Sequence, residues 1–286
     1  MPTRTPRSSP DTFDAAEPSV AIIGGTGIGH FPLDDGEEAR VLSLTTPYGE
    51  TAARVGKIGG RRVVFLARHG AGHRLPPHRI PYRANVCALA ALGVRGVLAT
   101  TAVGGLHLNL APGEFVLLDN FIDFTRDAQR GMTFFDAPGQ VVHTDFSVPY
   151  SPELRSALLE AARALEIPLR PTGTYLCGDG PRYETPAEVR LFAQWGADVV
   201  GMTGVPEATL AREAGLHYAG VSLVTNPGAG LSPTPLAHAE VEQAMADAAP
   251  RLQSLLLAAL ARIDPTGLPP VGPGVTPSGF SDVRIG

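Results

Sequence analysis

The sequence has little of several features that mark common protein classes. It contains 2 cysteines and 1 tryptophan in 286 residues, only 6% of its residues are aromatic, and its formal net charge is −5. Two cysteines are too few for a disulfide framework, and a weakly acidic chain lacks the basic surface that broad nucleic-acid binding requires. No run approaches the roughly 18 uncharged apolar residues that a membrane-spanning helix needs.

Cys87 and Cys177 both stand among apolar residues, which is typical of buried, reduced thiols in a cytosolic protein. The first 18 residues hold no apolar run, so no signal peptide is expected and the expected location is cytoplasmic. Neither a nucleic acid nor a membrane is expected as a partner. A small anion held by a few local cations remains possible.

Glycine and proline are abundant, at 33 and 27 residues. Because 44% of the residues are hydrophobic, this surplus predicts a globular protein with many turns rather than disorder. Residues 1–18 are polar and proline-rich, which predicts a disordered arm. Residues 265–286 are rich in both proline and glycine, which predicts a flexible tail. The expected domain spans residues 19–264.

Apolar, β-branched runs alternate with segments of helical periodicity, which predicts an α/β layer fold with a largely parallel or mixed sheet. The expected strands are 20–23, 63–67, 94–101, 115–124, 174–177, 199–202 and 218–225. The expected helices are 82–92, 151–166, 186–195, 206–214 and 237–262. Ser151 before Pro152 marks a helix start, Thr185 and Glu188 form a capping box, and Gly93 and Gly215 are expected C-caps.

Polar side chains and glycines follow most of the expected strands. In order along the chain they are the loop of residues 24–29 with Thr26, then Arg68-His69-Gly70, Thr100-Thr101-Ala102, Tyr183-Glu184, Met202-Thr203 and Thr225-Asn226. Ligands of α/β sheets bind beyond the carboxyl ends of strands, so these residues predict one pocket. An oxyanion ligand is favoured by the hydroxyls, by His69 and by Arg68, which can bind phosphate bidentately. Tyr183 beside Glu184 suits a planar heterocycle.

Three other interpretations of these residues fit less well. The glycine loop is not a dinucleotide-binding fingerprint, because His30 stands where the last glycine is required. The spacing of His69 and His73 would suit zinc on a helix, but Gly70 and Gly72 make a helix improbable, so no metal is expected. Asp179, Glu184 and Glu188 could suggest a glycosidase-type carboxylate pair, but the capping box already uses Glu188 and Asp179 suits a turn.

Several motifs in one order resemble the trimeric nucleoside phosphorylases. The resemblance runs from about residue 19 to 262 and rests on 20–29, 46–49, 68–70, 100–106, 121–123, 180–185, 195–198, 202–207 and 222–226. It implies a single α/β domain with a mixed central sheet flanked by helices. It also implies phosphate-dependent cleavage of purine nucleosides without metal or organic cofactor, by a homotrimer or a dimer of trimers.

The family has two branches, and the base-site residues decide between them. The Gly-Thr-Gly loop and Arg68-His69-Gly70 look like the methylthioadenosine phosphorylase branch. Glu184 and Asn226 instead resemble the branch that acts on 6-oxopurine nucleosides. An ionised Glu184 can accept a hydrogen bond from purine N1–H, and the Asn226 amide can donate toward O6 and interact with N7.

The resemblance also assigns the remaining site residues. Phosphate is expected against Thr26, Arg68, His69, Thr101, Ala102 and Thr203. Tyr183, Met202 and Gly228 are expected in the nucleoside site, His238 at the ribose 5′-hydroxyl, and His143 in the site of a neighbouring subunit. The predicted function is therefore phosphorolysis of inosine and guanosine in purine salvage. The alternative is a phosphorylase of S-methyl-5′-thioadenosine or S-methyl-5′-thioinosine.

Overall fold

The computed structural model describes residues 17–25, 33–34, 39–126, 130–233 and 238–286. Apart from its last two residues, the expected N-terminal arm lies outside the described residues.

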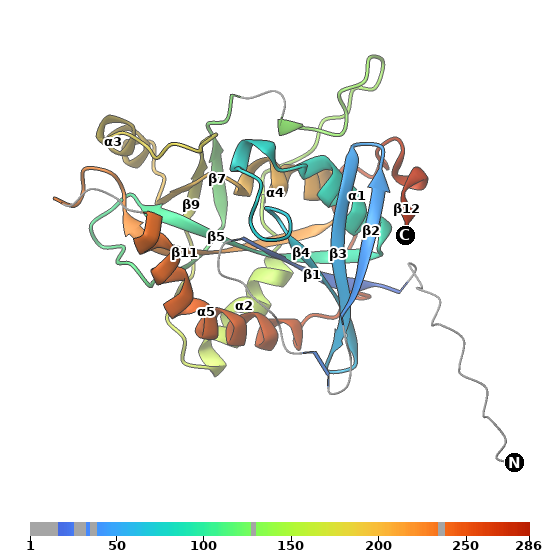
Figure 1. The fold of residues 1–286 in the computed structure, drawn as a ribbon, viewed down its shortest axis with the longest axis horizontal. Helices are drawn as coiled ribbons and strands as arrows, with labels where there is room; N and C mark the ends of the chain where they lie inside the picture. Colours follow the sequence, from blue (N-terminus) through green and yellow to red (C-terminus); the bar gives the residue numbers. More distant parts are fainter. Residues whose placement is uncertain (1–16, 26–32, 35–38, 127–129, 234–237) are drawn as a thin grey trace, which may run out of the picture.

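Within these residues, twelve strands form one mixed sheet, which confirms the predicted fold class (Figure 1). The main path of paired strands runs β12-β2-β3-β4-β1-β5-β10-β9-β7. Beside this path, β11 pairs with β5, β6 pairs with β11, and β8 pairs with β6. The strands are β1 (Ser19–Gly24), β2 (Arg40–Thr46), β3 (Gly49–Ile58), β4 (Arg61–Ala67), β5 (Val94–Gly105), β6 (Phe115–Leu117), β7 (Asn120–Asp123), β8 (Leu169–Arg170), β9 (Thr174–Cys177), β10 (Val199–Gly201), β11 (His217–Pro227) and β12 (Arg284–Ile285).

The long strand β5 is the junction of the sheet. β4, β1, β5 and β11 are parallel neighbours, so their carboxyl ends lie at one edge. β10 pairs antiparallel with the last two residues of β5, and so runs back along it. The carboxyl ends of β1 and β4 therefore lie at the same edge as the second half of β5, where β10 and β11 pair with it.

Five helices flank the sheet within the described residues: α1 (Tyr82–Ala91), α2 (Pro152–Ala164), α3 (Pro186–Gln194), α4 (Gly204–Glu213) and α5 (His238–Leu260). α1 and α4 pack on one face against Ala21 and Ile23 of β1, whereas α2 and α5 pack on the other against Val20 and Ile22. This alternation along one strand is expected for a sheet buried on both faces.

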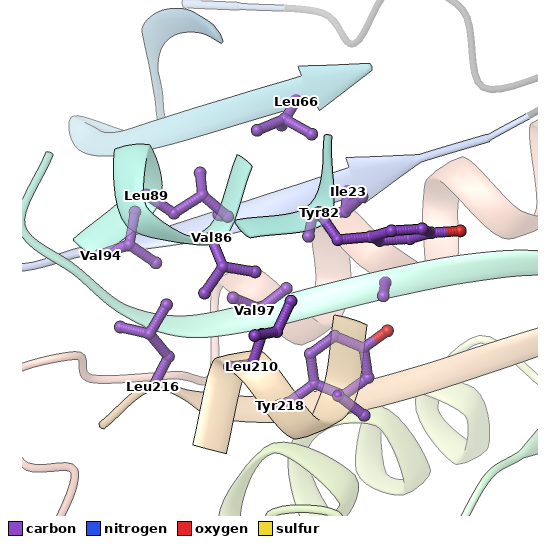
Figure 2. Close-up of a cluster of buried hydrophobic side chains, with 14 of the residues drawn as sticks. Ile23, Leu66, Tyr82, Val86, Leu89, Val94, Val97, Leu210, Leu216 and Tyr218 are labelled. Atoms are coloured by element: carbon purple, nitrogen blue, oxygen red, sulfur yellow. The ribbon is translucent and has the colours of Figure 1, made fainter. Parts of the chain in front are cut away.

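Figure 2 shows the α1 and α4 side of this core. Aliphatic side chains fill one end, and Tyr82 and Tyr218 lie at the other with their hydroxyls directed away from them. Both tyrosines are buried, and both hydroxyls bond to charged side chains near the site described below. The core is thus joined directly to the functional edge of the sheet.

The predicted helix ends are confirmed. The Ser151 hydroxyl accepts a hydrogen bond from the Leu154 N–H at the start of α2, and Thr185 and Glu188 form a complete capping box on α3. Gly93 and Gly215 follow α1 and α4 with φ of 74° and 73°, the left-handed conformation that ends helices.

Two strand predictions were wrong. The hairpin of β2 and β3 was not predicted, because half of its residues face solvent and polar residues interrupt its apolar pattern. The expected strand 115–124 is two strands, β6 and β7, which pair with different neighbours.

The segment 265–286 packs against the domain, where the sequence predicted a flexible tail. Its Leu268 is buried, Phe280 packs edge-on against Phe134, and β12 pairs with β2. The Pro269 carbonyl also lies 2.7 Å from His217 Nε2. Apolar side chains spaced between the prolines and glycines anchor the segment, a signal that composition alone conceals.

Both cysteines are free and buried, as predicted, and burial raises the pKa of each thiol to about 12. Among the described residues, no helix is long and apolar enough to cross a bilayer, and no three histidine, cysteine or acidic side chains are arranged to hold a metal ion.

Candidate active site

A cavity of about 590 Å³ lies where β1, β4, β5, β10 and β11 end. Its volume falls in the range of about 300–1,000 Å³ that is typical of small-molecule sites. Val241 and Met245 of α5 line one part of its wall, and the segments that follow β4 and β9 line others. The cavity therefore occupies the place where strand order and polarity predicted a pocket.

The structure brings most of the predicted site residues into this one cavity. They are Arg68, His69, Thr101, Ala102, Tyr183, Glu184, Met202, Thr203, Asn226 and Gly228. Three others are not placed there. Thr26 lies outside the described residues, His238 is described only by its backbone as the first residue of α5, and His143 is exposed on the segment between β7 and α2.

Arg68 is held by an ion pair at the floor of the cavity. Its Nε and Nη2 each donate to one carboxylate oxygen of Glu207 at 2.7 Å, and both side chains are 1% exposed. Nη1 donates to the Thr100 carbonyl at 2.8 Å, and the Tyr218 hydroxyl donates to Glu207 Oε1 at 2.7 Å. Burial lowers the pKa of Arg68, but the Glu207 carboxylate outweighs it and raises that pKa, so the guanidinium stays charged.

This pairing changes the expected role of Arg68. One edge of its fork belongs to Glu207, so it does not have the free bidentate grip that the sequence suggested. Three of its five N–H groups are used in these bonds, which leaves two for an anion in the cavity. Gly25 allows that approach, since a Cβ there would lie 3.2 Å from Arg68 Nη1. Arg68 is a fixed cation rather than a mobile clamp.

His69 is held as a neutral ring. Its Nδ1 lies 2.8 Å from the Leu75 carbonyl, which can only accept, so Nδ1 carries the proton. The ring stacks on His73 with centroids 4.1 Å apart. Burial, reinforced by the charge of Arg68, lowers the pKa of His69 to about 4. At neutral pH its Nε2 is therefore an acceptor, suited to the O–H of a partly protonated phosphate.

Hydroxyl groups complete this side of the cavity. Thr101 Oγ1 bonds to Ser222 Oγ at 2.8 Å. Thr203 caps α4, but its N–H and that of Gly204 both donate to the buried Tyr175 hydroxyl at 3.1 Å. Because the Thr203 side chain makes no capping bond, its hydroxyl is the group that this residue offers to the cavity.

Glu184 and Tyr183 also line the cavity, on the segment that leads into α3. Glu184 is half-buried, and burial raises the pKa of its carboxyl. Glu188 does not share the cavity wall. It closes the capping box and accepts two hydrogen bonds from Arg182, which together lower its pKa to about 2. Glu184 is therefore the acid of this pair that lines the cavity.

Asn226 has a fixed orientation at the end of β11. Its Nδ2 donates to the Pro227 carbonyl at 2.9 Å, and its Oδ1 accepts from the Thr225 hydroxyl at 2.8 Å. The Pro227 carbonyl can only accept, so the amide cannot be flipped. A register shift between Val224 and Asn226 turns the strand at this point. One Nδ2 hydrogen is used by Pro227, so the amide presents its second hydrogen as a donor.

Three residues beside the cavity were missed by the sequence analysis or left without a role. Glu207 appeared only within a motif, Tyr175 only within a strand, and Arg130 not at all. Glu207 and Arg130 are buried charges, and Tyr175 is a buried hydroxyl. An acid in the first turn of a buried helix was the available signal for Glu207, but nothing local to the sequence distinguished Arg130 from a surface arginine.

The sequence model of the Phosphorylase superfamily matches residues 19–261. This chain belongs to that superfamily. The match covers every strand and helix that lines the cavity, so the cavity is the candidate active site of a phosphorylase-superfamily protein.

Individual relatives of this superfamily member come from both branches. A probable 6-oxopurine nucleoside phosphorylase of Dictyoglomus turgidum is 51% identical over 247 residues, covering 85% of this chain and 91% of the relative. An S-methyl-5′-thioadenosine phosphorylase of Pyrococcus horikoshii is 43% identical over 249 residues, covering 86% and 93%. A crystal structure of methylthioadenosine phosphorylase from Schistosoma mansoni with adenine superposes with a TM-score of 0.79 at 33% identity, covering 85% and 91%.

Replacing Glu207 with glutamine should strongly lower the free energy of unfolding of the protein. The substitution leaves the buried Arg68 cation without its counter-charge, which costs roughly 3–5 kcal/mol for a broken buried pair. Asp136→Asn is the matched control, because it removes an exposed partner of Arg83 and should cost less than about 1 kcal/mol. Urea unfolding at pH 7 measures both; equal losses would contradict the importance of the buried pair.

The ring of His69 should titrate near pH 4 in the folded protein. Its pKa lies below the unfolded value of 6.5, so the unfolded chain binds more protons between these two values. The contribution of His69 to the free energy of unfolding is therefore fully present above about pH 6.5 and is lost progressively as the pH falls toward 4. NMR of the ring nitrogens measures the titration, with His69→Gln to assign the signal. A midpoint near 6.5 would contradict the buried, neutral ring.

Proposed function

We propose that this chain is a purine nucleoside phosphorylase that cleaves 6-oxopurine nucleosides with phosphate, giving free base and pentose 1-phosphate for purine salvage. The orientation of Asn226 is the observation that carries the proposal, because the locked amide presents an N–H donor to the same cavity as Glu184. The 51% identity to a probable 6-oxopurine nucleoside phosphorylase supports the same substrate class.

The donor and acceptor pattern of the base selects the substrate. A 6-oxopurine offers an O6 acceptor to the Asn226 amide and an N1–H donor to ionised Glu184. A 6-aminopurine turns an N6–H donor toward the amide and an unprotonated N1 toward the acid. Each mismatched buried contact costs about 1–3 kcal/mol, so the two together set a preference of at least about tenfold for the 6-oxopurine.

Phosphate is proposed to bind on the other side of the cavity, against Arg68, His69, Thr101, Ala102 and Thr203, with Thr26 added from the glycine loop. It attacks C1′ of the sugar as the glycosidic bond breaks, and the bonding electrons leave with the purine. Holding the two reactants in line supplies up to about 7–11 kcal/mol through proximity. Asn226 and Glu184 stabilise the charge that builds on the departing base.

This proposed reaction takes phosphate as a co-substrate and uses no metal or organic cofactor. Met202 and Gly228 are assigned to the nucleoside, and His238 to the ribose 5′-hydroxyl. Arg68 keeps two N–H groups for the anion, and Glu207 fixes the position of its guanidinium.

We also propose a cytoplasmic homotrimer or dimer of trimers in which His143 enters a neighbouring site. The exposed stretch around residue 140, between β7 and α2, supports this, because it extends away from the body of the subunit (Figure 1). On it, Val141 is 80% exposed and His143 is exposed as well.

A second candidate is phosphorolysis of S-methyl-5′-thioinosine. The buried apolar side chains Val241 and Met245 line the cavity, and apolar walls suit a thiomethyl group in place of a 5′-hydroxyl. Glu184 and Asn226 are compatible with this substrate, since its base is also a 6-oxopurine.

The test compares inosine, guanosine, adenosine and the two 5′-methylthio nucleosides, each with and without phosphate. Inosine and guanosine should be cleaved only with phosphate, with pentose 1-phosphate as product and kcat/KM at least about tenfold above that of adenosine. Equal cleavage without phosphate would contradict phosphorolysis. Preference for methylthioadenosine would contradict the assigned base contacts, and preference for methylthioinosine would establish the second candidate.

A further inference from the structure

Arg130 is a fully buried cation that lies just outside the cavity wall. Its side chain is 0% exposed. Nη1 donates to the Asp179 carbonyl at 3.1 Å, and Nη2 lies 2.7 Å from the Met202 carbonyl, 2.9 Å from the Val205 carbonyl and 3.2 Å from the Tyr82 hydroxyl. One guanidinium thus binds three main-chain carbonyls from two separate segments.

A buried guanidinium in this setting is costly to maintain. The nearest carboxylate oxygen, Asp179 Oδ1, lies 3.8 Å from Nη1, beyond a hydrogen bond. The Nε–H has no hydrogen-bond partner among the described residues. Removing an arginine from water without a close counter-ion is unfavourable, and apolar residues of similar volume often stabilise such sites better. Its presence here therefore calls for an explanation other than core stability.

The two segments that Arg130 joins carry different predicted parts of the site. They are neighbours, because β9 pairs with β10 and the Gly178 N–H donates to the Gly201 carbonyl at 2.9 Å. Asp179 lies four residues before Tyr183 and five before Glu184, on the segment assigned to the base. Met202 is followed directly by Thr203, assigned to phosphate, and then by α4, which carries Glu207. Beyond the backbone bond of Gly178 to Gly201, the carbonyls of Asp179 and Met202 bond to the same guanidinium, which ties the two segments to each other.

We propose that Arg130 is a positioning residue that holds the base-binding segment at a fixed distance from the phosphate-binding segment. This inference rests on the proposed function. Arg130 touches neither substrate; it keeps phosphate and the glycosidic carbon aligned when both sites are filled. Misplacement of a reacting group by about 1 Å can lower the rate about 100-fold. Loss of the Arg130 bonds to the carbonyls should therefore lower kcat.

The test uses Arg130→Met and Arg130→Lys in the full-length chain. Methionine removes every bond to the carbonyls, and kcat for inosine phosphorolysis should fall at least tenfold. Each half of the site stays intact, so the Kd of hypoxanthine alone and of phosphate alone should stay within threefold of the unmodified protein. Lysine keeps the charge but cannot hold three carbonyls, so the kcat of Arg130→Lys should fall at least fivefold. If Arg130→Met does not fold, the kcat of Arg130→Lys tests the proposal.

Arg62→Met is the matched control. Arg62 is also a buried arginine that donates to carbonyls, those of Leu92 and Glu17, but it does not line the cavity. Its loss should lower Tm and leave kcat within twofold.

Three results separate the possible failures. Variants of Arg130 with kcat within twofold of the unmodified protein would overturn the inference, as would a loss of ligand binding and kcat in equal proportion. Failure of the unmodified protein to cleave inosine with phosphate would instead contradict the proposed function.

Discussion

The ion pair of Arg68 and Glu207 is the constraint on which the site depends. It joins the residue after β4 to the first turn of α4, and Tyr218 ties the same carboxylate to β11. Three elements far apart in sequence therefore meet at one buried charge pair. A cation alone at this depth would be driven toward water, and an acid alone would repel the anion that the cavity is proposed to hold. Together they leave a fixed, partly compensated positive charge.

This arrangement determines how the site can act on an anion. Phosphate would meet two N–H groups of a guanidinium that does not move, a neutral His69 and several hydroxyls. Charges and dipoles that are held in place in this way contribute most to catalysis, because they need not reorganise during a reaction. Arg130 extends the same principle to the backbone, since it fixes carbonyls rather than side chains.

Much of the fold could be predicted because its elements carry local signals. Capping residues in the local sequence mark two helix starts, at Ser151 and Thr185, and two helix ends, at Gly93 and Gly215. These signals require no knowledge of tertiary contacts. The hairpin of β2 and β3 and the packed segment 265–286 carry no such signal. Their stability comes from contacts with distant residues, such as Phe280 on Phe134, which composition and periodicity do not report.

The candidate site divides in the same way. Residues at strand ends, such as Thr101 and Asn226, could be predicted because parallel strands bring their carboxyl ends to one edge. Glu207 and Arg130 act through partners that only the folded chain brings near, so their roles could not be predicted from the sequence. The direction of the Asn226 amide depends on the Pro227 carbonyl, a contact that follows from the register shift in β11.

The central claim is that Asn226 selects a 6-oxopurine by donating a hydrogen bond. The most direct measurement is the ratio of kcat/KM for inosine to that for adenosine in Asn226→Asp, compared with the unmodified protein. An acid of the same shape replaces a donor with an acceptor for N6–H, so the ratio should fall at least about tenfold, which corresponds to about 1.4 kcal/mol. A ratio that stays within twofold would contradict the account.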